Sequence, residues 1–400
     1  MEKSIEQPLI LHRGIPYFLL FSLYAIINSY LPIMLRTVGF STAQIGILLG
    51  VIEIVGVCTP FFIMRQLDKT GRYGLVMCIF GFDIALLLLP LLRFHSFFVT
   101  ALCLGIFAAG FKGMVPVLDG FTTKALGRHD AQYGKIRALG SAGFVGMNLF
   151  LQLHPLISGR KPVSMILSVS AAAVLFVITL RWVPDLYASS YTCTDGSDGT
   201  EKQSLRNAAI TDGHGTAVVV FPKLFWECLL LIFFAFLGLV PSQRFFSLYV
   251  EEYVGVEASA GLWALSAMAE IPLLIISGKL IRRFGKEPLL AVCLLSVIIR
   301  NCCYIFIPGI SGAIVGQLLH SLSFGLFHPL SVLLCILYSC GKTATAMAFF
   351  TAANGVAYVI GSVIGGYIIE YLGYPALFLL FNVFPVAGIV FYLFTMRQKQ

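Results

Sequence analysis

The chain has 400 residues, 58% of them hydrophobic and only 12% charged, and its formal net charge is +8. A mean hydropathy of +0.90 excludes an ordinary soluble domain and indicates a chain that crosses a lipid bilayer many times. The basic residues lie in short segments between apolar runs, as membrane topology requires, so their excess does not indicate a nucleic-acid partner.

In chain order, twelve apolar stretches have the composition of membrane-spanning helices. We expect them near 15–35, 42–64, 74–92, 96–120, 133–153, 163–182, 224–250, 258–281, 288–307, 311–338, 343–369 and 375–396. With both chain ends on the cytoplasmic side, most of the 27 Lys and Arg residues face inside. The polar start of the chain leads into a full-length span without a small-residue cleavage site, so no removable signal is expected.

One long polar stretch, from Pro184 to Pro222, is rich in Gly, Ser, Thr and Asp and has no helical period. It predicts a flexible cytoplasmic linker over 184–222, or a segment that binds a partner. The domains predicted on either side are an N-terminal six-helix bundle over 1–183 and a C-terminal six-helix bundle over 223–400. The fold class is therefore an all-α polytopic membrane protein with twelve transmembrane helices and cytoplasmic termini.

Ten cysteines lie almost all within apolar runs, and no CxxC motif occurs. They are expected as small hydrophobic residues of helix cores, and the sequence predicts no disulfide framework, metal site or cofactor. Neither HExxH nor GxSxG occurs, and the segment before Gly341-Lys342-Thr343 lacks the first glycine of a phosphate loop. These absences argue against an enzyme.

The two halves share a repeated loop, which follows the second and the eighth predicted span. Both copies fit G-x-x-x-D-[RK]-x-G-[RK] with one departure each, Met64 for the glycine and Arg282 for the aspartate. Such a basic turn caps two helices, and its acid can bind a neighbouring helix end. The loop resembles the signature of the major facilitator superfamily, which assigns a conformational role to Asp68, Gly71, Arg72, Arg282 and Gly285. Repeats of this kind imply a substrate site at the midplane between the bundles.

Two pairs of opposite charges lie at matched depth within predicted hairpins. Asp119 and Arg137 are equally far from the turn at Arg128, so they are expected to meet, because each helical residue rises by the same distance. Glu270 and Arg300 are equally far from Gly285. Each pair indicates either a polar pathway through the membrane or a structural clamp between two helices.

Further polar residues lie within the spans. Arg244 follows Pro241, where a helix break could turn the guanidinium toward a cavity; alternatively the side chain extends toward Glu251 and Glu252. Asn28 is a candidate ligand or an interhelical hydrogen bond. Glu53, Asp83 and Lys112 lie at the middles of the second, third and fourth spans, and His320 lies in the tenth.

Four stretches in order extend the resemblance over nearly the whole chain. They are Leu31-Pro32 with Gly39-Phe40-Ser41-Thr42, PVLDGFTT with YGKIRALGS, LWALSAMAE with KLIRRFG, and QLLHSLSFGLFH. Together they resemble the phenylpropionate-permease branch of the superfamily, near the lactose-permease type and the nucleoside–proton symporters. The resemblance implies a bacterial inner-membrane transporter.

Individual residues carry the resemblance further. Asp119 and Arg137 match the sugar-binding acid and its partner in lactose-permease-type proteins. Phe144 replaces the tryptophan that stacks on sugar there, which disfavours a galactoside. His320 and Arg300 match a histidine and an arginine of the same type, but Ser323 replaces its proton-carrying glutamate. Glu270 instead matches the eighth-span glutamate of the nucleoside symporters.

The sequence therefore predicts a monomeric secondary active transporter, with protons as the coupling ion, because titratable groups lie at the midplane. The substrate is an aromatic or other carboxylate, or alternatively a neutral sugar or nucleoside. A non-transporting sensor or a channel on the same fold is the alternative of another class. The predicted substrate residues are Asn28, Asp119, Arg137, Phe144, Arg244 and Glu270, and the predicted proton-coupling residues are Glu270, Arg300, His320 and Asp119.

Overall fold

The computed structural model describes residues 2–126, 132–184, 186–187 and 221–395. In these ranges the chain forms helices and the short turns between them, with no strand. The predicted all-helical membrane fold is confirmed. Nearly all of the predicted linker lies outside the described residues.

Six main helices precede the linker. They are α1 (Glu2–Val38), α2 (Thr42–Thr70), α3 (Tyr73–Leu86), α4 (Phe97–Leu126), α5 (Tyr133–Leu153) and α6 (Pro162–Leu180), with a short 3₁₀ turn η1 (Leu89–Leu92) after α3. Helix α2 begins where its sequence provides a capping box. The Ser41 side chain accepts a hydrogen bond from the backbone N–H of Gln44, and the Gln44 side chain accepts one from the backbone N–H of Ser41. The same helix ends at Gly71, which adopts the left-handed conformation that glycine tolerates.

The helices after the linker are more broken. They are α8 (Lys223–Arg244), α9 (Phe246–Leu248), α10 (Ser259–Phe284), α11 (Lys286–Phe306), α12 (Gly309–Leu318), α13 (Phe327–Leu337), α14 (Thr343–Phe381) and α15 (Val383–Thr395). Two π-helical turns interrupt them, η3 (Tyr249–Val254) and η4 (Ser321–Leu326). Single π-helical turns are frequent at functional sites, and η4 directly follows His320.

Ten segments of the described chain are long and apolar enough to cross a membrane. Helix α5 is not among them, since its basic residues and glycines lower its hydropathy. Helices α14 and α15 fall within one apolar segment, although Gly373 has non-helical dihedral angles and kinks α14. The predicted count of twelve spans stays a prediction.

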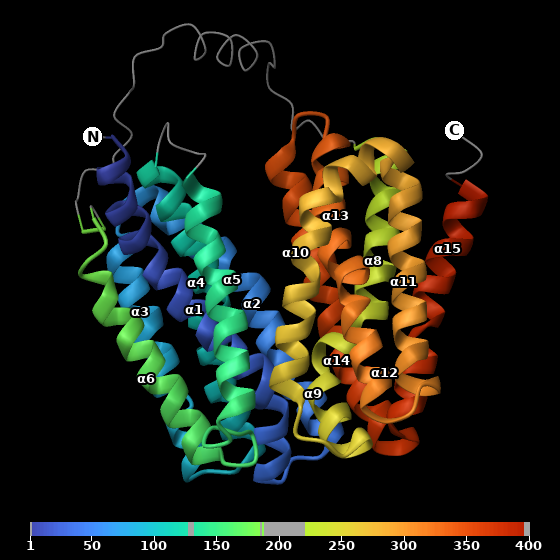
Figure 1. The fold of residues 1–400 in the computed structure, drawn as a ribbon, viewed down its shortest axis with the longest axis horizontal. Coiled ribbons are helices and arrows are strands. Elements are labelled where there is room, and N and C mark those ends of the chain that lie inside the picture. The colour runs from blue at the N-terminus through green and yellow to red at the C-terminus, as the bar shows by residue number, and fades with distance from the viewer. Residues whose placement is uncertain (1, 127–131, 185, 188–220, 396–400) are drawn as a thin grey trace, which may run out of the picture.

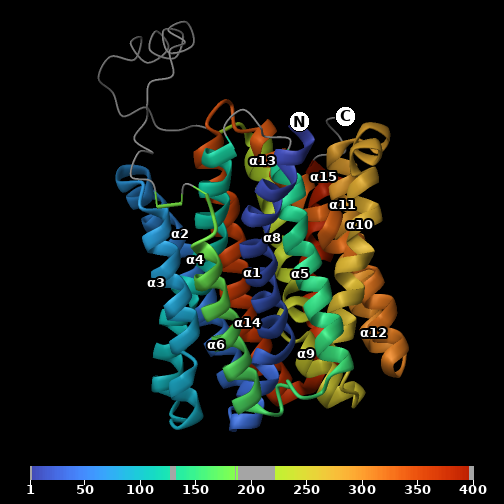
Figure 2. The same ribbon diagram turned by 60° about the vertical axis from the view of Figure 1, so that its left-hand side comes forward.

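The helices before the linker and those after it form two groups that lie side by side (Figure 1). Helix α2 packs along α14, and α5 packs along α10, so these two pairs join the groups. The turned view places α1 in the middle of the molecule (Figure 2). Both chain ends are marked at the same end of the molecule, as the predicted topology requires.

The opposite end of the molecule is closed by polar contacts between the two groups, and we call it the sealed end. Arg36 pairs with Glu252 at 2.8 Å, and Arg160 pairs with both Glu251 and Glu257 at 2.7 Å. Burial raises the pKa of Glu251 although Arg160 opposes this effect, and the hydrogen bond to Glu251 raises the pKa of Arg160.

The helix backbones also approach each other closely at the sealed end. The Glu370 carboxylate of α14 accepts a hydrogen bond of 2.8 Å from the backbone N–H of Ala43, in the first turn of α2. A carboxylate is favourable there because of the helix dipole. A Cβ atom on Gly46 would lie 2.3 Å from the backbone oxygen of Ser362 and 3.0 Å from the Cα of Gly366. Only glycine permits this approach.

The end that carries the chain termini is the open end, which we define by residues 58–70 of α2 and 267–284 of α10. In the first range only Leu67 is buried, and in the second none of the described residues is. By contrast, the first eight residues of α10 include six buried ones. Since a helix covered by a neighbour buries one face, these ranges have lost the cover that the sealed end keeps.

Candidate functional site

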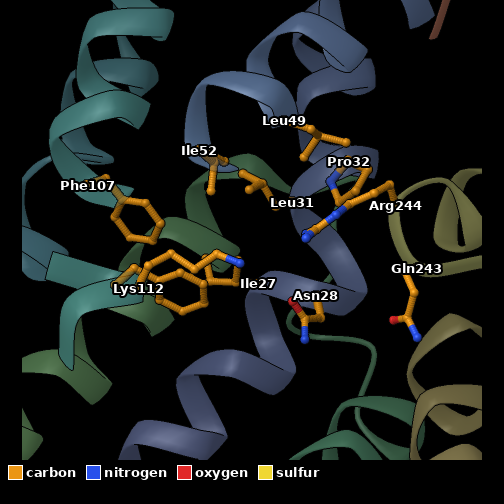
Figure 3. Close-up of a pocket in the computed structure, with 11 residues that line it drawn as sticks. Ile27, Asn28, Leu31, Pro32, Leu49, Ile52, Phe107, Lys112, Gln243 and Arg244 are labelled. Carbon is orange, nitrogen blue, oxygen red and sulfur yellow. The ribbon is translucent and has the colours of Figure 1, made fainter. Parts of the chain in front are cut away.

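A pocket lies between the two groups, lined by residues of α1, α2, α4 and the end of α8 (Figure 3). Lys112 and Arg244 point toward each other from opposite sides, and Asn28 and Gln243 add polar groups. The rest of the lining is apolar: Ile27, Leu31, Pro32, Leu49, Ile52, Phe107 and Phe111. The free volume is about 30 Å³, enough for water but not for an organic molecule.

Glu53 of α2 joins the two basic side chains of the pocket. Its Oε1 lies 2.8 Å from Nζ of Lys112 and 2.7 Å from a terminal nitrogen of Arg244. The Arg244 guanidinium also lies over the ring of Tyr358, 4.3 Å from its centroid. The side chains are 8% to 24% exposed, so little water screens their charges. Two bases and one acid give the cluster a formal charge of +1.

The position of Arg244 decides between the two interpretations of its sequence. Helix α8 ends at this residue, just after Pro241, and the side chain enters the pocket as the cavity prediction requires. The alternative, an extension toward Glu251 and Glu252, is wrong, because those acids bind Arg160 and Arg36 instead.

Sequence reasoning placed Glu53 and Lys112 at the middles of their spans but did not bring them together. The signal available was that a buried base needs an acid at its own depth, and Glu53 is the acid that α2 supplies there. Their pairing depends on how α2 packs against α4.

A second charged pair lies in the first group. Nε of Arg137 lies 3.7 Å from Oδ1 of Asp119, which confirms the predicted pair. The Tyr17 hydroxyl donates to Asp119 at 2.7 Å, and the guanidinium lies 4.2 Å from the ring centroid of Phe21. Both charged side chains are about a third exposed, at 33% and 29%, so this pair is less buried than the Glu53 cluster.

The second group holds a different pair from the one that matched depth suggested. Glu270 lies 2.6 Å from Nε2 of His320, whereas Arg300 binds the Tyr304 hydroxyl, the Ser323 hydroxyl and the Gln317 carbonyl. The predicted Glu270–Arg300 pairing is therefore wrong. Equal distance from a turn fixes depth but not the face of the helix, and Arg300 faces α12 and η4.

Arg300 is fully buried, and its three polar partners are all neutral. A buried cation of this kind raises the free energy of a second positive charge nearby. The Glu270 carboxylate, which binds His320, supplies a negative charge in the same helix group.

The remaining predicted substrate residues differ in their positions. Asn28 lines the pocket, and its backbone carbonyl accepts a hydrogen bond of 3.2 Å from the Ser247 hydroxyl of α9. Phe144 is half-buried and packs against the apolar core, and it is not among the residues that line this pocket. Asn148 of α5 is not a predicted substrate residue; it accepts a hydrogen bond from the Ser29 hydroxyl of α1.

The repeated loop makes the contact expected of its acid. Asp68 lies 3.0 Å from Nζ of Lys124, in the last turn of α4, so the loop after α2 is held to a neighbouring helix end. Gly71 and Gly285 have φ values of 65° and 81°, which explains glycine at both turns. Arg72 directly precedes α3, and Arg282 lies in the last turn of α10.

Two groups of apolar helices with a charged pocket between them define a helical membrane protein with a polar site inside it. The particular family follows from comparison with known proteins: the model of the MFS_1 like family matches residues 12–380, so the chain belongs to this family of the major facilitator superfamily. It is a multi-pass membrane protein, and its bacterial relatives indicate the bacterial inner membrane.

Two relatives match almost end to end. An uncharacterized transporter of Bacillus subtilis (strain 168), YwbF, is 23% identical over 95% of this chain and 90% of its own. A probable 3-phenylpropionic acid transporter of Escherichia coli (strain K12) is 23% identical over 92% of this chain and 96% of its own. Among solved structures, a mutant of the nucleoside transporter NupG has a TM-score of 0.81 at 16% identity, over 96% of this chain and 99% of that one. The structural likeness supports the fold alone.

Proposed function

We propose that this transporter carries a small organic carboxylate, in symport with protons, by alternating access. The main observation that supports the substrate class is the formal charge of +1 on the Glu53–Lys112–Arg244 cluster. A carboxylate brings that charge to zero, whereas a neutral ligand leaves a surplus cation in a site that water screens little.

The hydrogen-bond inventory of the pocket supports the same substrate class. Within the described part of the chain, Nε of Arg244 and Nε2 of Gln243 are buried without a hydrogen-bond partner. Both are donors, and both belong to residues that line the pocket. A guanidinium binds a carboxylate through two parallel hydrogen bonds, a geometry that lysine does not reproduce.

The sealed and open ends support alternating access. In this conformation the pocket lies between a closed end and an end where α2 and α10 are uncovered. We propose that the bundles 1–183 and 223–400 rock against each other about the pocket, that the linker 184–222 allows this movement, and that the chain acts as a monomer.

Glu270 and His320 are the proposed proton site, with Arg300 setting its charge balance. The Glu270 side chain is 24% exposed while His320 is buried, so a proton can enter from the open end and be held between the two. Glu270→Gln is expected to abolish uphill accumulation but to spare exchange of substrate across the membrane. Accumulation that persists in this variant, with a normal proton flux, would assign the proton elsewhere.

A neutral nucleoside or sugar is the second candidate substrate. It is favoured by the partly exposed Asp119, which can accept hydrogen bonds from hydroxyl groups, and by a maltose permease relative that is 23% identical over 72% of this chain. The fold shared with the nucleoside transporter NupG is compatible with it.

Uptake into sealed vesicles tests these assignments. Purified protein in proteoliposomes would be given labelled 3-phenylpropionate, its neutral amide, uridine and maltose, with and without an acid outer solution. We expect proton-dependent uptake of the carboxylate only. Arg244→Lys should weaken carboxylate binding by about 1–3 kcal/mol, the scale of a charged hydrogen bond, and leave neutral ligands unaffected. Uptake of uridine or maltose would favour the second candidate, and no flux of any solute would favour a sensor.

A further inference from the structure

We propose that Glu53 is a resident counter-ion, which the substrate carboxylate displaces from Arg244 while Lys112 keeps hold of it. This inference deepens the proposed function and rests on it. It assigns a role in substrate binding to both residues. Glu53 competes with the substrate carboxylate for Arg244, and Lys112 pairs with Glu53 after the substrate has displaced it.

The size of the pocket is the first support. A free volume of about 30 Å³ admits no organic carboxylate beside the Glu53–Arg244 pair. The 2.7 Å contact between the two side chains also places the Glu53 carboxylate where an arginine fork would hold a substrate carboxylate. A substrate that binds Arg244 must therefore move Glu53 away.

The second support is the arrangement of charges. Glu53 reaches both bases through the same oxygen, so the loss of one contact leaves the other at 2.8 Å. After displacement the site holds two ion pairs, substrate with Arg244 and Glu53 with Lys112, and its formal charge is zero. Without Lys112, displacement would leave a carboxylate unpaired in a site where its side chain is only 8% exposed.

The third support is where the pair lies. Lys112 and Glu53 belong to the same helix group, whereas Arg244 belongs to the other. Displacement therefore removes the ion pair between the groups and keeps the one within the first group. The substrate itself then connects the groups, so movement of the bundles is tied to its carboxylate. A neutral ligand offers nothing that can replace Glu53 on Arg244.

The test measures equilibrium binding of 3-phenylpropionate and of its amide to purified wild type and to three variants. Lys112→Met should weaken carboxylate binding at least about tenfold, since Glu53 then competes for Arg244 without an alternative partner. Glu53→Gln should strengthen carboxylate binding, because the competitor is gone. The double variant should bind like Glu53→Gln and not like Lys112→Met.

Two outcomes would overturn the inference. One is that Glu53→Gln weakens carboxylate binding, as a fixed structural clamp predicts. The other is that the double variant binds more weakly than Lys112→Met. As a matched control, Asp83→Asn removes an acid from α3 that accepts from the Gly110 backbone and does not line the pocket, and it should leave affinity unchanged.

A second variant covers the case in which Glu53→Gln does not fold. Glu53→Asp keeps the charge but shortens the side chain, which loosens its hold on Arg244, so carboxylate binding should tighten; unchanged or weaker binding contradicts the inference. Carboxylate binding by the wild type distinguishes failure of the proposed function from failure of the counter-ion assignment. If it binds no carboxylate, the proposed function fails; if it binds carboxylate but neither Glu53 variant binds more tightly, only the counter-ion assignment fails.

Discussion

The two ends of the molecule differ in what connects the helix groups. At the sealed end Arg160 binds two acids of the other group, and Glu370 binds the first turn of α2. At the open end, described residues 267–284 of α10 include no buried side chain. Besides the packing of α2 on α14 and of α5 on α10, the groups are thus joined at one end by charged and polar contacts, which water can replace at modest cost when they separate. This difference between the ends is what the proposed rocking of the two bundles about the pocket requires.

The largest expected effect comes from breaking the close backbone contact at the sealed end. Gly46→Val places atoms against the Ser362 carbonyl and Gly366, so we expect a cost of about 1–3 kcal/mol to the closed conformation and loss of transport. Spin labels across the sealed end should report a longer distance. The control is Gly134→Val in α5, where a Cβ atom meets nothing within 4 Å. Unchanged transport in Gly46→Val would show that this contact is not needed.

A smaller effect is expected from the ion pairs of the sealed end. Arg160→Ala removes the partner of Glu251 and Glu257 and should shift the equilibrium toward opening of this end by about 1 kcal/mol, because Arg160 is half exposed and screened by solvent. The same label distance measures it. Lys124→Ala breaks the pair with Asp68 inside one group and should leave that distance unchanged. If the label distance across the sealed end changed equally in Arg160→Ala and Lys124→Ala, the ion pairs between the groups would have no special role in closing that end.

The Asp119–Arg137 pair sharpens the comparison, because it lies within one group and is partly exposed. At 29% and 33% exposure its contribution to folding is expected to be about 0.2–1 kcal/mol, which thermal unfolding of Arg137→Ala would measure. Substrate transport should fall more than stability does. If either single variant transports at the wild-type rate, the pair is not part of the pathway.

The smallest effect concerns pH at the sealed end. Burial raises the pKa of Glu251 while Arg160 opposes the shift, and Glu257 and Glu252 add to it. The sealed conformation thus binds a proton more tightly than an opened one in which Glu251 meets water. Acidification should favour the sealed end, and this contribution is lost as pH rises through the raised pKa, above the ordinary value of 4.5. The label distance should follow pH in wild type but less in Glu251→Gln, and opening in acid would contradict the sign.

Depth along each helix followed from the sequence alone. Helical rise is constant, so counting from Arg128 placed Asp119 and Arg137 opposite each other, and the structure confirms their contact. Apolar runs gave the helices, and the repeated loop placed Asp68 beside a helix end. These features depend on local geometry, which spacing in the sequence specifies.

The tertiary structure decided which face each charge presents and which helix lies against it. Glu270 and Arg300 share a depth, yet His320 binds Glu270 and Arg300 binds neutral groups, because rotation about a helix axis is set by packing. The Glu53–Lys112–Arg244 cluster draws on three helices from both groups. No spacing along the chain encodes that meeting, since it arises only when the two groups pack together in one particular arrangement.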